Sequence, residues 1–313
     1  AIESIYQSQG RVDEYIDFAD KAGVIKDKSD GEKEAMYFNA AEQIFMTENY
    51  NKALTSLMAY LERYPSGQKV PAAEFYVAEC YRNIGKKEQA CDWYTKSLSR
   101  GSESSFAETA MLNFSRLSYE LQRYKDAYGG YSSLLEDARI DNNRHTARVG
   151  MLRSAFKAGD WTSAISCADR VREDSKSTAE EIREAEYSKA KSLLSMNERS
   201  AAYEIFAALS ARPSTSEGAE AAYMIILDAY DQGKYDSVEK KVYAFAEKAG
   251  DQSYWLAKAF IVLGDSFAEQ DNLQQAKATF ESVLNGYKPA SGKSDDVLDN
   301  VRMRLDKLKN MER

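Results

Sequence analysis

The chain has 313 residues, of which 43% are hydrophobic, so it carries enough apolar side chains to bury a sizeable core. Its net charge of −8 and pI of about 5.1 argue against a general nucleic-acid-binding protein, because phosphate affinity comes from clustered lysine and arginine. No apolar run approaches the roughly 18 residues that would span a bilayer, so we expect no direct membrane insertion.

Helices are the first elements that the pattern predicts. Residues 11–23 look like the second helix of a pair, and only Ile2, Ile5 and Tyr6 remain of the first. Residues 34–47 place apolar side chains three and four positions apart, and residues 50–64 do so again after a short polar break. Pro65 then ends the second helix, so this stretch is predicted to form one helical hairpin.

The same two-helix pattern recurs six more times. A small residue in the second helix marks it at intervals of 37, 37, 37, 38, 36 and 38 residues: Ala53, Ala90, Ala127, Ala164, Ala202, Val238 and Ala276. It should lie where the two helices approach closely, opposite Ala41, Ala78, Ser115, Leu152, Ala190, Ile226 or Gly264 in the first helix. A constant period of this length predicts an all-α solenoid, a superhelix of about seven stacked hairpins.

Further signals concern the starts of helices and the end of the array. Three sequences have the capping-box pattern: Ser29-x-x-Glu32, Ser105-x-x-Glu108 and Thr178-x-x-Glu181. Pro213 lies in the polar connector 210–218, which we expect to be the loosest join. Residues 297–308 form one amphipathic pattern, the expected cap that covers the last apolar face.

The chain resembles the tetratricopeptide repeat family over about residues 34–289. The seventh unit carries the resemblance best, through Phe260, Leu263, Gly264, Phe267, Leu273, Ala276, Phe280 and Leu284. It implies a remnant of an upstream repeat at 1–31, seven repeats within 32–289 and a capping helix at 290–313. The repeats are expected at about 34–67, 71–104, 108–141, 145–178, 183–216, 219–252 and 257–289. Each unit exceeds the usual 34 residues by two to four, as in tetratricopeptide proteins of bacterial cell envelopes of the Tol-Pal-associated or outer-membrane-assembly type.

The resemblance also implies a concave groove lined by the first helix of each repeat. The residues that map onto it as candidate partner-binding side chains are Phe38, Phe45, Phe75, Arg82, Arg116, Tyr119, Arg153, Phe156, Tyr187, Lys191, Tyr223 and Tyr230. Aromatic anchors beside arginines are typical of peptide-binding surfaces, so we expect a protein or peptide partner with carboxylates and apolar side chains. Two alternatives stay open: the aromatics pack against neighbouring repeats, and the arginines pair with Glu79, Glu120 or Glu184.

Catalytic and metal-binding patterns are missing from the sequence. The single histidine, His145, has no nucleophile elbow beside it, and no phosphate loop, dinucleotide fingerprint or HExxH motif occurs. Cys80, Cys91 and Cys167 have no metal-ligand spacing, although a bridge between Cys80 and Cys91 stays open. We therefore expect no enzyme, no cofactor and no metal.

The sequence thus favours a non-catalytic scaffold that binds a partner segment in its groove. One alternative is a glycan-binding envelope protein of the starch-utilisation type, for which the 21 tyrosines would suit. Another is a structural spacer or self-association segment of a longer protein. The resemblance favours a cell envelope or periplasm, and a cytoplasmic location also stays open.

Overall fold

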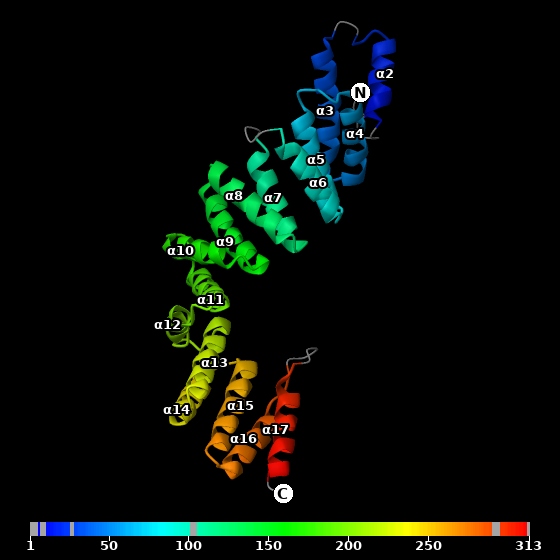
Figure 1. Ribbon diagram of the computed structural model, residues 1–313. Coiled ribbons are helices and arrows are strands. Elements are labelled where there is room, and N and C mark those ends of the chain that lie inside the picture. The colour runs from blue at the N-terminus through cyan, green and yellow to red at the C-terminus, as the bar shows by residue number, and fades with distance from the viewer. Residues whose placement is uncertain (1–5, 7–10, 26–27, 101–104, 290–294, 312–313) are drawn as a thin grey trace. The chain divides into compact units, whose positions relative to one another are not determined.

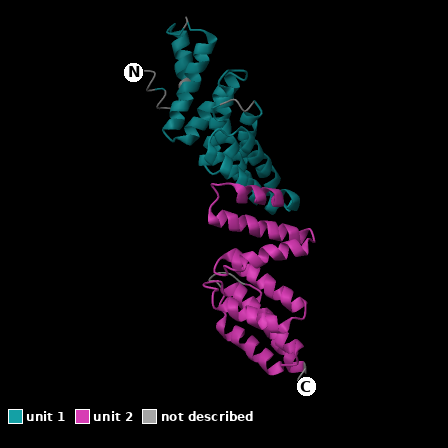
Figure 2. Ribbon diagram, turned by 90° about the vertical axis from the view of Figure 1, so that its left-hand side faces the viewer, with its two compact units in different colours: residues 1–163 teal, residues 164–313 magenta. Residues whose placement is uncertain are grey.

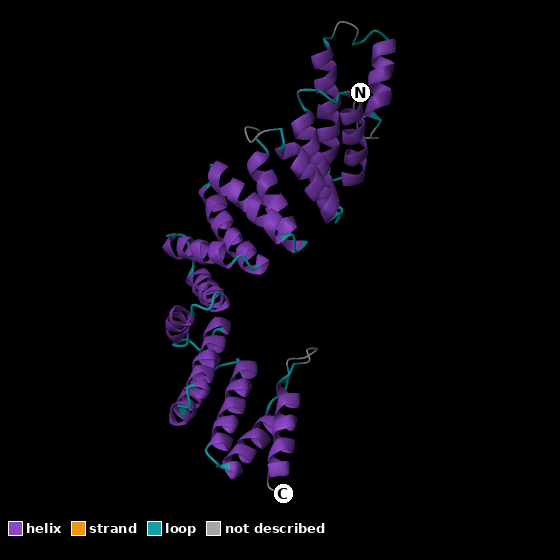
Figure 3. Ribbon diagram, viewed as in Figure 1, coloured by secondary structure: helices purple, strands orange, loops and turns teal. Residues whose placement is uncertain are grey.

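The computed structural model describes residues 6, 11–25, 28–100, 105–289 and 295–311 (Figure 1). All regular elements within these residues are helices, as Figure 3 shows, so the predicted all-α repeat fold is confirmed. The chain divides into two compact units, residues 1–163 and 164–313 (Figure 2). Ile2 and Ile5, from which we predicted a truncated helix, lie outside the described residues.

Unit 1 is a stack of antiparallel helices in which each helix packs against the next along the chain. Its helices are α2 (Val12–Lys21), α3 (Asp30–Met46), α4 (Tyr50–Arg63), α5 (Val70–Asn83), α6 (Lys87–Leu98), α7 (Ala107–Glu120), α8 (Tyr124–Asp137) and α9 (Asp141–Ala158). The first helices of neighbouring pairs also meet, since α3 contacts α5 and α7 contacts α9. Each repeat therefore packs on the next through both of its helices.

Unit 2 continues the same pattern, and the division between the units falls within α10 (Trp161–Glu173). Its other helices are α11 (Ala179–Ser195), α12 (Arg199–Leu209), α13 (Ser216–Asp231), α14 (Tyr235–Ala246), α15 (Ser253–Glu269), α16 (Leu273–Gly286) and α17 (Val297–Met311). The last helix covers α15 and α16 through the buried side chains of Val297, Val301 and Leu308, while Arg302 and Lys309 are exposed.

The small residues that mark the period lie at the centre of the core. All seven, from Ala53 to Ala276, have an exposed fraction of 0%. Their expected partners in the first helices are buried too, including the larger Leu152 and Ile226 at 1%. The periodic residues in the sequence are therefore the ones that allow the helices to approach.

The turn between the two helices of each repeat also repeats. One residue per turn has a positive φ of 56° to 81°: Glu48, Gly85, Gln122, Gly159, Asn197, Gly233 and Asp271. Only three of these seven are glycine, although the left-handed region costs other L-residues about 1–2 kcal/mol. The intervals between them are the same as those between the small residues.

Two of the three predicted capping boxes are confirmed. Ser29 and Thr178 each accept from the backbone N–H of the glutamate three residues later, and that glutamate accepts from the cap in return. The prediction at Ser105 is wrong, because α7 is capped by Phe106 without a side-chain bond. Glu108 instead accepts hydrogen bonds from the backbone N–H groups of Arg139 and Ile140 and from the Asn143 amide.

Candidate functional site

The predicted partner-binding residues all lie on first helices, distributed over the two units. Unit 1 holds those on α3, α5, α7 and α9, and unit 2 holds those on α11 and α13: Tyr187, Lys191, Tyr223 and Tyr230. Their surroundings differ enough that they separate into buried, internally paired and exposed side chains.

Phe38 and Phe75 are buried within unit 1, with exposed fractions of 4% and 6%. The Phe38 ring packs against Tyr60 of α4 and Tyr76 of α5, with centroids 5.7 and 6.1 Å apart. The Phe75 ring stacks on Phe106 at 4.7 Å. Their aromatic faces are covered by neighbouring repeats, so neither is available to a partner.

Four other predicted aromatics pack across the turn of their own repeat. Each is half-buried and meets, at ring-centroid distances of 5.3 to 5.9 Å, the aromatic residue that opens the second helix: Phe45 with Tyr50, Tyr119 with Tyr124, Phe156 with Trp161, and Tyr230 with Tyr235. The partners are always five residues apart, a signal present in the sequence. One part of each ring therefore packs against its neighbour, and this contact fixes the orientation of the part that stays accessible.

Carboxylates on first helices join one repeat to the next. In unit 1, Tyr76 donates to Glu42 at 2.7 Å and Asn113 donates to Glu79 at 2.7 Å. In unit 2, Arg304 of α17 donates through Nε to both oxygens of Asp265, at 2.7 and 2.9 Å. These acids are satisfied within the protein, so they add little free negative charge to the surface.

The predicted cations Arg82 and Lys191 are paired with such carboxylates. Arg82 lies 2.7 Å from Glu79, which also accepts from Tyr94, and this confirms one of the pairings that we left open. Lys191 lies 2.9 Å from Glu220, which accepts from the Tyr187 hydroxyl at 2.7 Å as well. Burial and this bond to Glu220 raise the pKa of Tyr187 well above its usual range.

Arg116 and Arg153 are exposed, as is Arg82. They directly follow Ser115 and Leu152, the partner residues of consecutive repeats, on helices that contact each other. Burial raises the pKa of Tyr131, and the positive charges of both guanidinium groups oppose that rise. No ion pair to Arg116 occurs within the described part of the chain. Arg116 and Tyr119 of α7, with Arg153 and Phe156 of α9, are named here the α7/α9 surface.

Unit 2 has a hollow of about 310 Å³ between α13, α15 and α17. Tyr223, Tyr230 and Ile261 contribute apolar surface to it. Its charges are paired: Lys258 lies 3.2 Å from Asp296, and Arg304 lies 2.7 Å from Asp265. Lys258 also lies over the ring of Tyr223, 5.6 Å from its centroid. We call this site the α13/α17 hollow. It can receive an apolar side chain of a partner, and the charges around its edge are already paired within the protein.

Cysteines and metal-ligating residues form no reactive centre in the described residues. Cys80, Cys91 and Cys167 are buried and form no disulfide, so the bridge between Cys80 and Cys91 that we left open is not formed. Burial raises the pKa of Cys80 to about 12, which makes its thiol a poor nucleophile. Within the same residues, no group of three or more histidine, cysteine or acidic side chains could hold a metal ion, and no helix has the length and apolarity to cross a membrane.

Comparisons with known proteins bear on the family. Residues 254–288 match the model of the tetratricopeptide repeat. No curated protein shows a significant match to the sequence.

Several solved structures are similar to the chain. The C-terminal part of a TPR repeat-containing protein from Cytophaga hutchinsonii has a TM-score of 0.52 at 16% identity, over 84% of this chain and 98% of that one. A tetratricopeptide repeat protein from Parabacteroides merdae has a TM-score of 0.44 at 16% identity, over 88% and 99%. YrrB, described as a TPR protein with an unusual peptide-binding site, has a TM-score of 0.46 at 19% identity, over 64% and 96%. Residues 254–288 are thus similar to one tetratricopeptide repeat, and the chain shares its all-α repeat fold with the Cytophaga protein.

Proposed function

We propose that this chain is a non-catalytic interaction scaffold that binds an extended, acidic segment of a partner protein on the α7/α9 surface. Proteins of the tetratricopeptide repeat family are generally protein-interaction scaffolds and are typically non-enzymatic. The observation that carries the proposal is the exposure of Arg116 and Arg153 at equivalent positions of two adjacent repeats. Carboxylates at the same position of other repeats, Glu42 and Glu79, are used inside the protein.

Charge and fixed aromatic surface act together on this face. A segment that crosses α7 and α9 meets one guanidinium on each helix, and each guanidinium can bind a carboxylate. Tyr119 and Phe156 lie three residues further along the same helices, held by Tyr124 and Trp161. Preordered side chains lose little conformational entropy when they bind, which favours recognition of apolar side chains between the carboxylates. On unit 2, we propose that the α13/α17 hollow binds an apolar side chain of the partner.

The repeat boundaries belong to the same proposal. We propose the division into an upstream remnant at 1–31, seven repeats within 32–289 and a cap at 290–313. The burial of Val297 and Val301 beneath exposed Arg302 supports the assignment of α17 as the cap. The bacterial cell envelope as the location stays a prediction from resemblance, and cell fractionation of the tagged protein would test it.

The test is a double charge reversal, Arg116→Glu with Arg153→Glu. The probe is a labelled peptide of about twelve residues in which leucine and glutamate alternate, and fluorescence anisotropy measures its Kd. Exposed ion pairs contribute about 0.2–1 kcal/mol each, and reversal adds repulsion of similar size, so we expect a loss of about 1–2 kcal/mol in total. This corresponds to a roughly five- to thirtyfold higher Kd.

The matched control is Lys52→Glu with Lys125→Glu. It makes the same change of net charge in unit 1, at exposed positions on the second helices α4 and α8. We expect it to leave the Kd within about twofold, and a version of the peptide with glutamine in place of glutamate to bind weakly. Equal losses in both double variants, or no binding of the acidic peptide at all, would contradict the proposal.

A further inference from the structure

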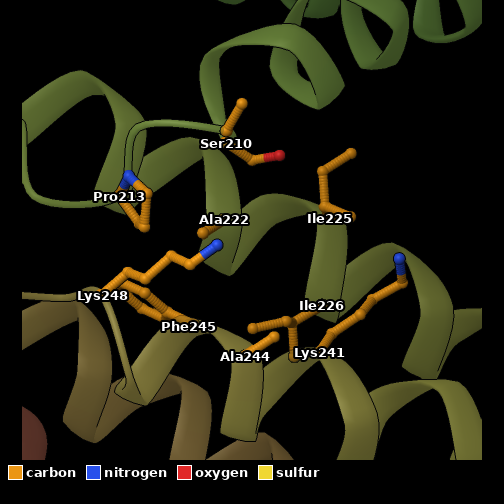
Figure 4. A pocket seen from close by; sticks show the side chains of 10 residues that line it. Ser210, Pro213, Ala222, Ile225, Ile226, Lys241, Ala244, Phe245 and Lys248 are labelled. Carbon is orange, nitrogen blue, oxygen red and sulfur yellow. The ribbon is translucent and has the colours of Figure 1, made fainter.

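A second hollow, of about 190 Å³, lies in unit 2 away from the residues described above. Its walls come from the connector that follows α12, from helices α13 and α14, and from Lys248 just after α14. Figure 4 shows Pro213 on one side, Ile225 and Ile226 on the other, and Phe245 below. Pro213, Ile226 and Phe245 are buried, and the accessible lining is divided about equally between polar and apolar groups. We call this site the lysine hollow, after Lys241 and Lys248 at its edges.

The connector that forms one wall is fixed by hydrogen bonds. The Thr215 hydroxyl donates to the carbonyl of Arg212 at 2.9 Å and accepts from the backbone N–H of Gly218 at 3.1 Å. Further along the chain, the Gln252 amide donates to the carbonyl of Ser214 at 3.3 Å. The connector that we expected to be the loosest join of the array thus carries hydrogen bonds of its own and one from Gln252.

The charge at the edges of the lysine hollow is not compensated. Lys241 lies on α14, whereas Lys248 lies in the turn that follows it, and both line the hollow. No acidic residue lines the hollow, and neither lysine has an ion pair among the described residues. In the α13/α17 hollow, by contrast, both Lys258 and Arg304 are paired with aspartates.

The size of the lysine hollow sets the size of its occupant. A dry cavity of about 150 Å³ is large enough to bind benzene, so about 190 Å³ accommodates one aromatic ring or one leucine-sized group. A larger apolar ligand would project into solvent past Ala244, which is itself exposed. The two lysines can then bind anionic groups on either side of the inserted group.

We propose that the lysine hollow is a docking site for an acidic peptide segment of a partner protein, with one aromatic side chain as its anchor. The anchor inserts between Pro213, Ile226 and Phe245. Carboxylates before and after the anchor bind Lys241 and Lys248. The charge complementarity selects this occupant, because two lysines line the hollow and no acidic residue does. The site is independent of the α7/α9 surface.

The test uses the full chain and a labelled, blocked pentapeptide with a central phenylalanine, a glycine on each side of it, and a glutamate at each end. Kd is measured by fluorescence anisotropy for the unchanged chain, for Lys241→Glu with Lys248→Glu, and for Ala244→Phe. The last variant fills the hollow from an exposed position without changing charge. We expect each to raise Kd at least tenfold, and a glutamine-flanked peptide to bind at least tenfold more weakly than the glutamate-flanked one.

Two controls separate this site from general charge effects and from the proposed function. Lys234→Glu with Lys277→Glu makes the same change of net charge in unit 2 at positions outside the hollow, and it should leave Kd within about twofold. The Arg116→Glu and Arg153→Glu variant should also bind the pentapeptide normally. Circular dichroism confirms that each variant is folded.

Several results would overturn the proposal. They are an unchanged Kd in either hollow variant, equal affinity for the glutamine-flanked peptide, and absence of binding by the unchanged chain. Binding to phosphatidylserine vesicles that the lysine reversal abolishes, in place of peptide binding, would assign the site to a membrane surface. Self-association that the same reversal abolishes, measured by light scattering, would assign it to a second copy of the chain.

Discussion

Two adjacent glycines in α8 allow the packing between helices to be measured against helix propensity. A Cβ at Gly129 would have nothing within 4 Å, whereas a Cβ at Gly130 would lie 2.4 Å from the Ser115 hydroxyl oxygen and 2.9 Å from the Phe114 ring. Replacing glycine by alanine inside a helix gains about 0.5–1 kcal/mol from backbone entropy. We expect Gly129→Ala to raise the free energy of unfolding by that amount.

The same substitution at Gly130 should have the opposite sign. Ser115 is fully buried, and its hydroxyl donates to the Met111 carbonyl at 2.6 Å, so it cannot turn away without losing that bond. Overpacking costs about 1–3 kcal/mol, which offsets or exceeds the gain in helix propensity. The gain in helix propensity is the same at neighbouring positions of one helix. The free energies of unfolding of the two variants should therefore differ by about 1–3 kcal/mol, with Gly130→Ala the less stable.

Urea denaturation followed by circular dichroism measures both variants, and the midpoints are compared at equal slope. Adding Ser115→Ala to Gly130→Ala removes the obstructing oxygen and should restore part of the loss, with a coupling energy of about 0.5–3 kcal/mol. If Gly129→Ala and Gly130→Ala shift the midpoint equally and in the same direction, the close approach of α7 and α8 does not have the energetic effect that we assign to it.

Two further predictions concern the turns and the buried tyrosines. Gln122→Gly should raise the free energy of unfolding by about 0.5–1 kcal/mol, because the relief of strain in the left-handed region outweighs the entropy cost of glycine. The control Lys125→Gly, at an exposed position of α8, should lower the free energy of unfolding by about 1 kcal/mol. Thermal or urea denaturation that ranks the two in the opposite order would contradict this. Burial raises the pKa of Tyr60 and Tyr94, with the nearby Glu34 and Glu79 adding to the effect, so the folded protein keeps them neutral where the unfolded chain ionises near pH 10. Their contribution to stability is therefore complete below pH 10 and falls above it by about 1.4 kcal/mol per pH unit for each tyrosine. If the free energy of unfolding declines between pH 10 and 11 as steeply in Tyr60→Phe as in the unchanged protein, this account is wrong.

The sequence was sufficient for the fold because the fold repeats. Ala53 and its equivalents could be identified from their spacing alone, and every one is fully buried. The candidate site was less accessible to prediction, because a position on the first helix fixes the direction of a side chain but not what covers it. Phe38 is covered by Tyr76 of the next repeat, which the pattern of its own helix cannot reveal. The five-residue spacing of Tyr119 and Tyr124 was a usable local signal for a packed pair. Each hollow combines residues from at least two helices that are apart in the sequence, so no single motif marks it.

The carboxylate bonds between first helices have a consequence for the lineage of such an array. Glu79 on α5 depends on Asn113 from α7, and Asp265 on α15 depends on Arg304 from α17. Loss of one whole period preserves such a bond only where the new neighbour has a donor at the same position: Tyr76 and Asn113 are equivalent donors, whereas the next equivalent residue, Gly150, has no side chain that can donate. Loss of the repeat that holds α5 should therefore leave Glu42 facing Asn113, while loss of the repeat that holds α7 should leave Glu79 without its donor.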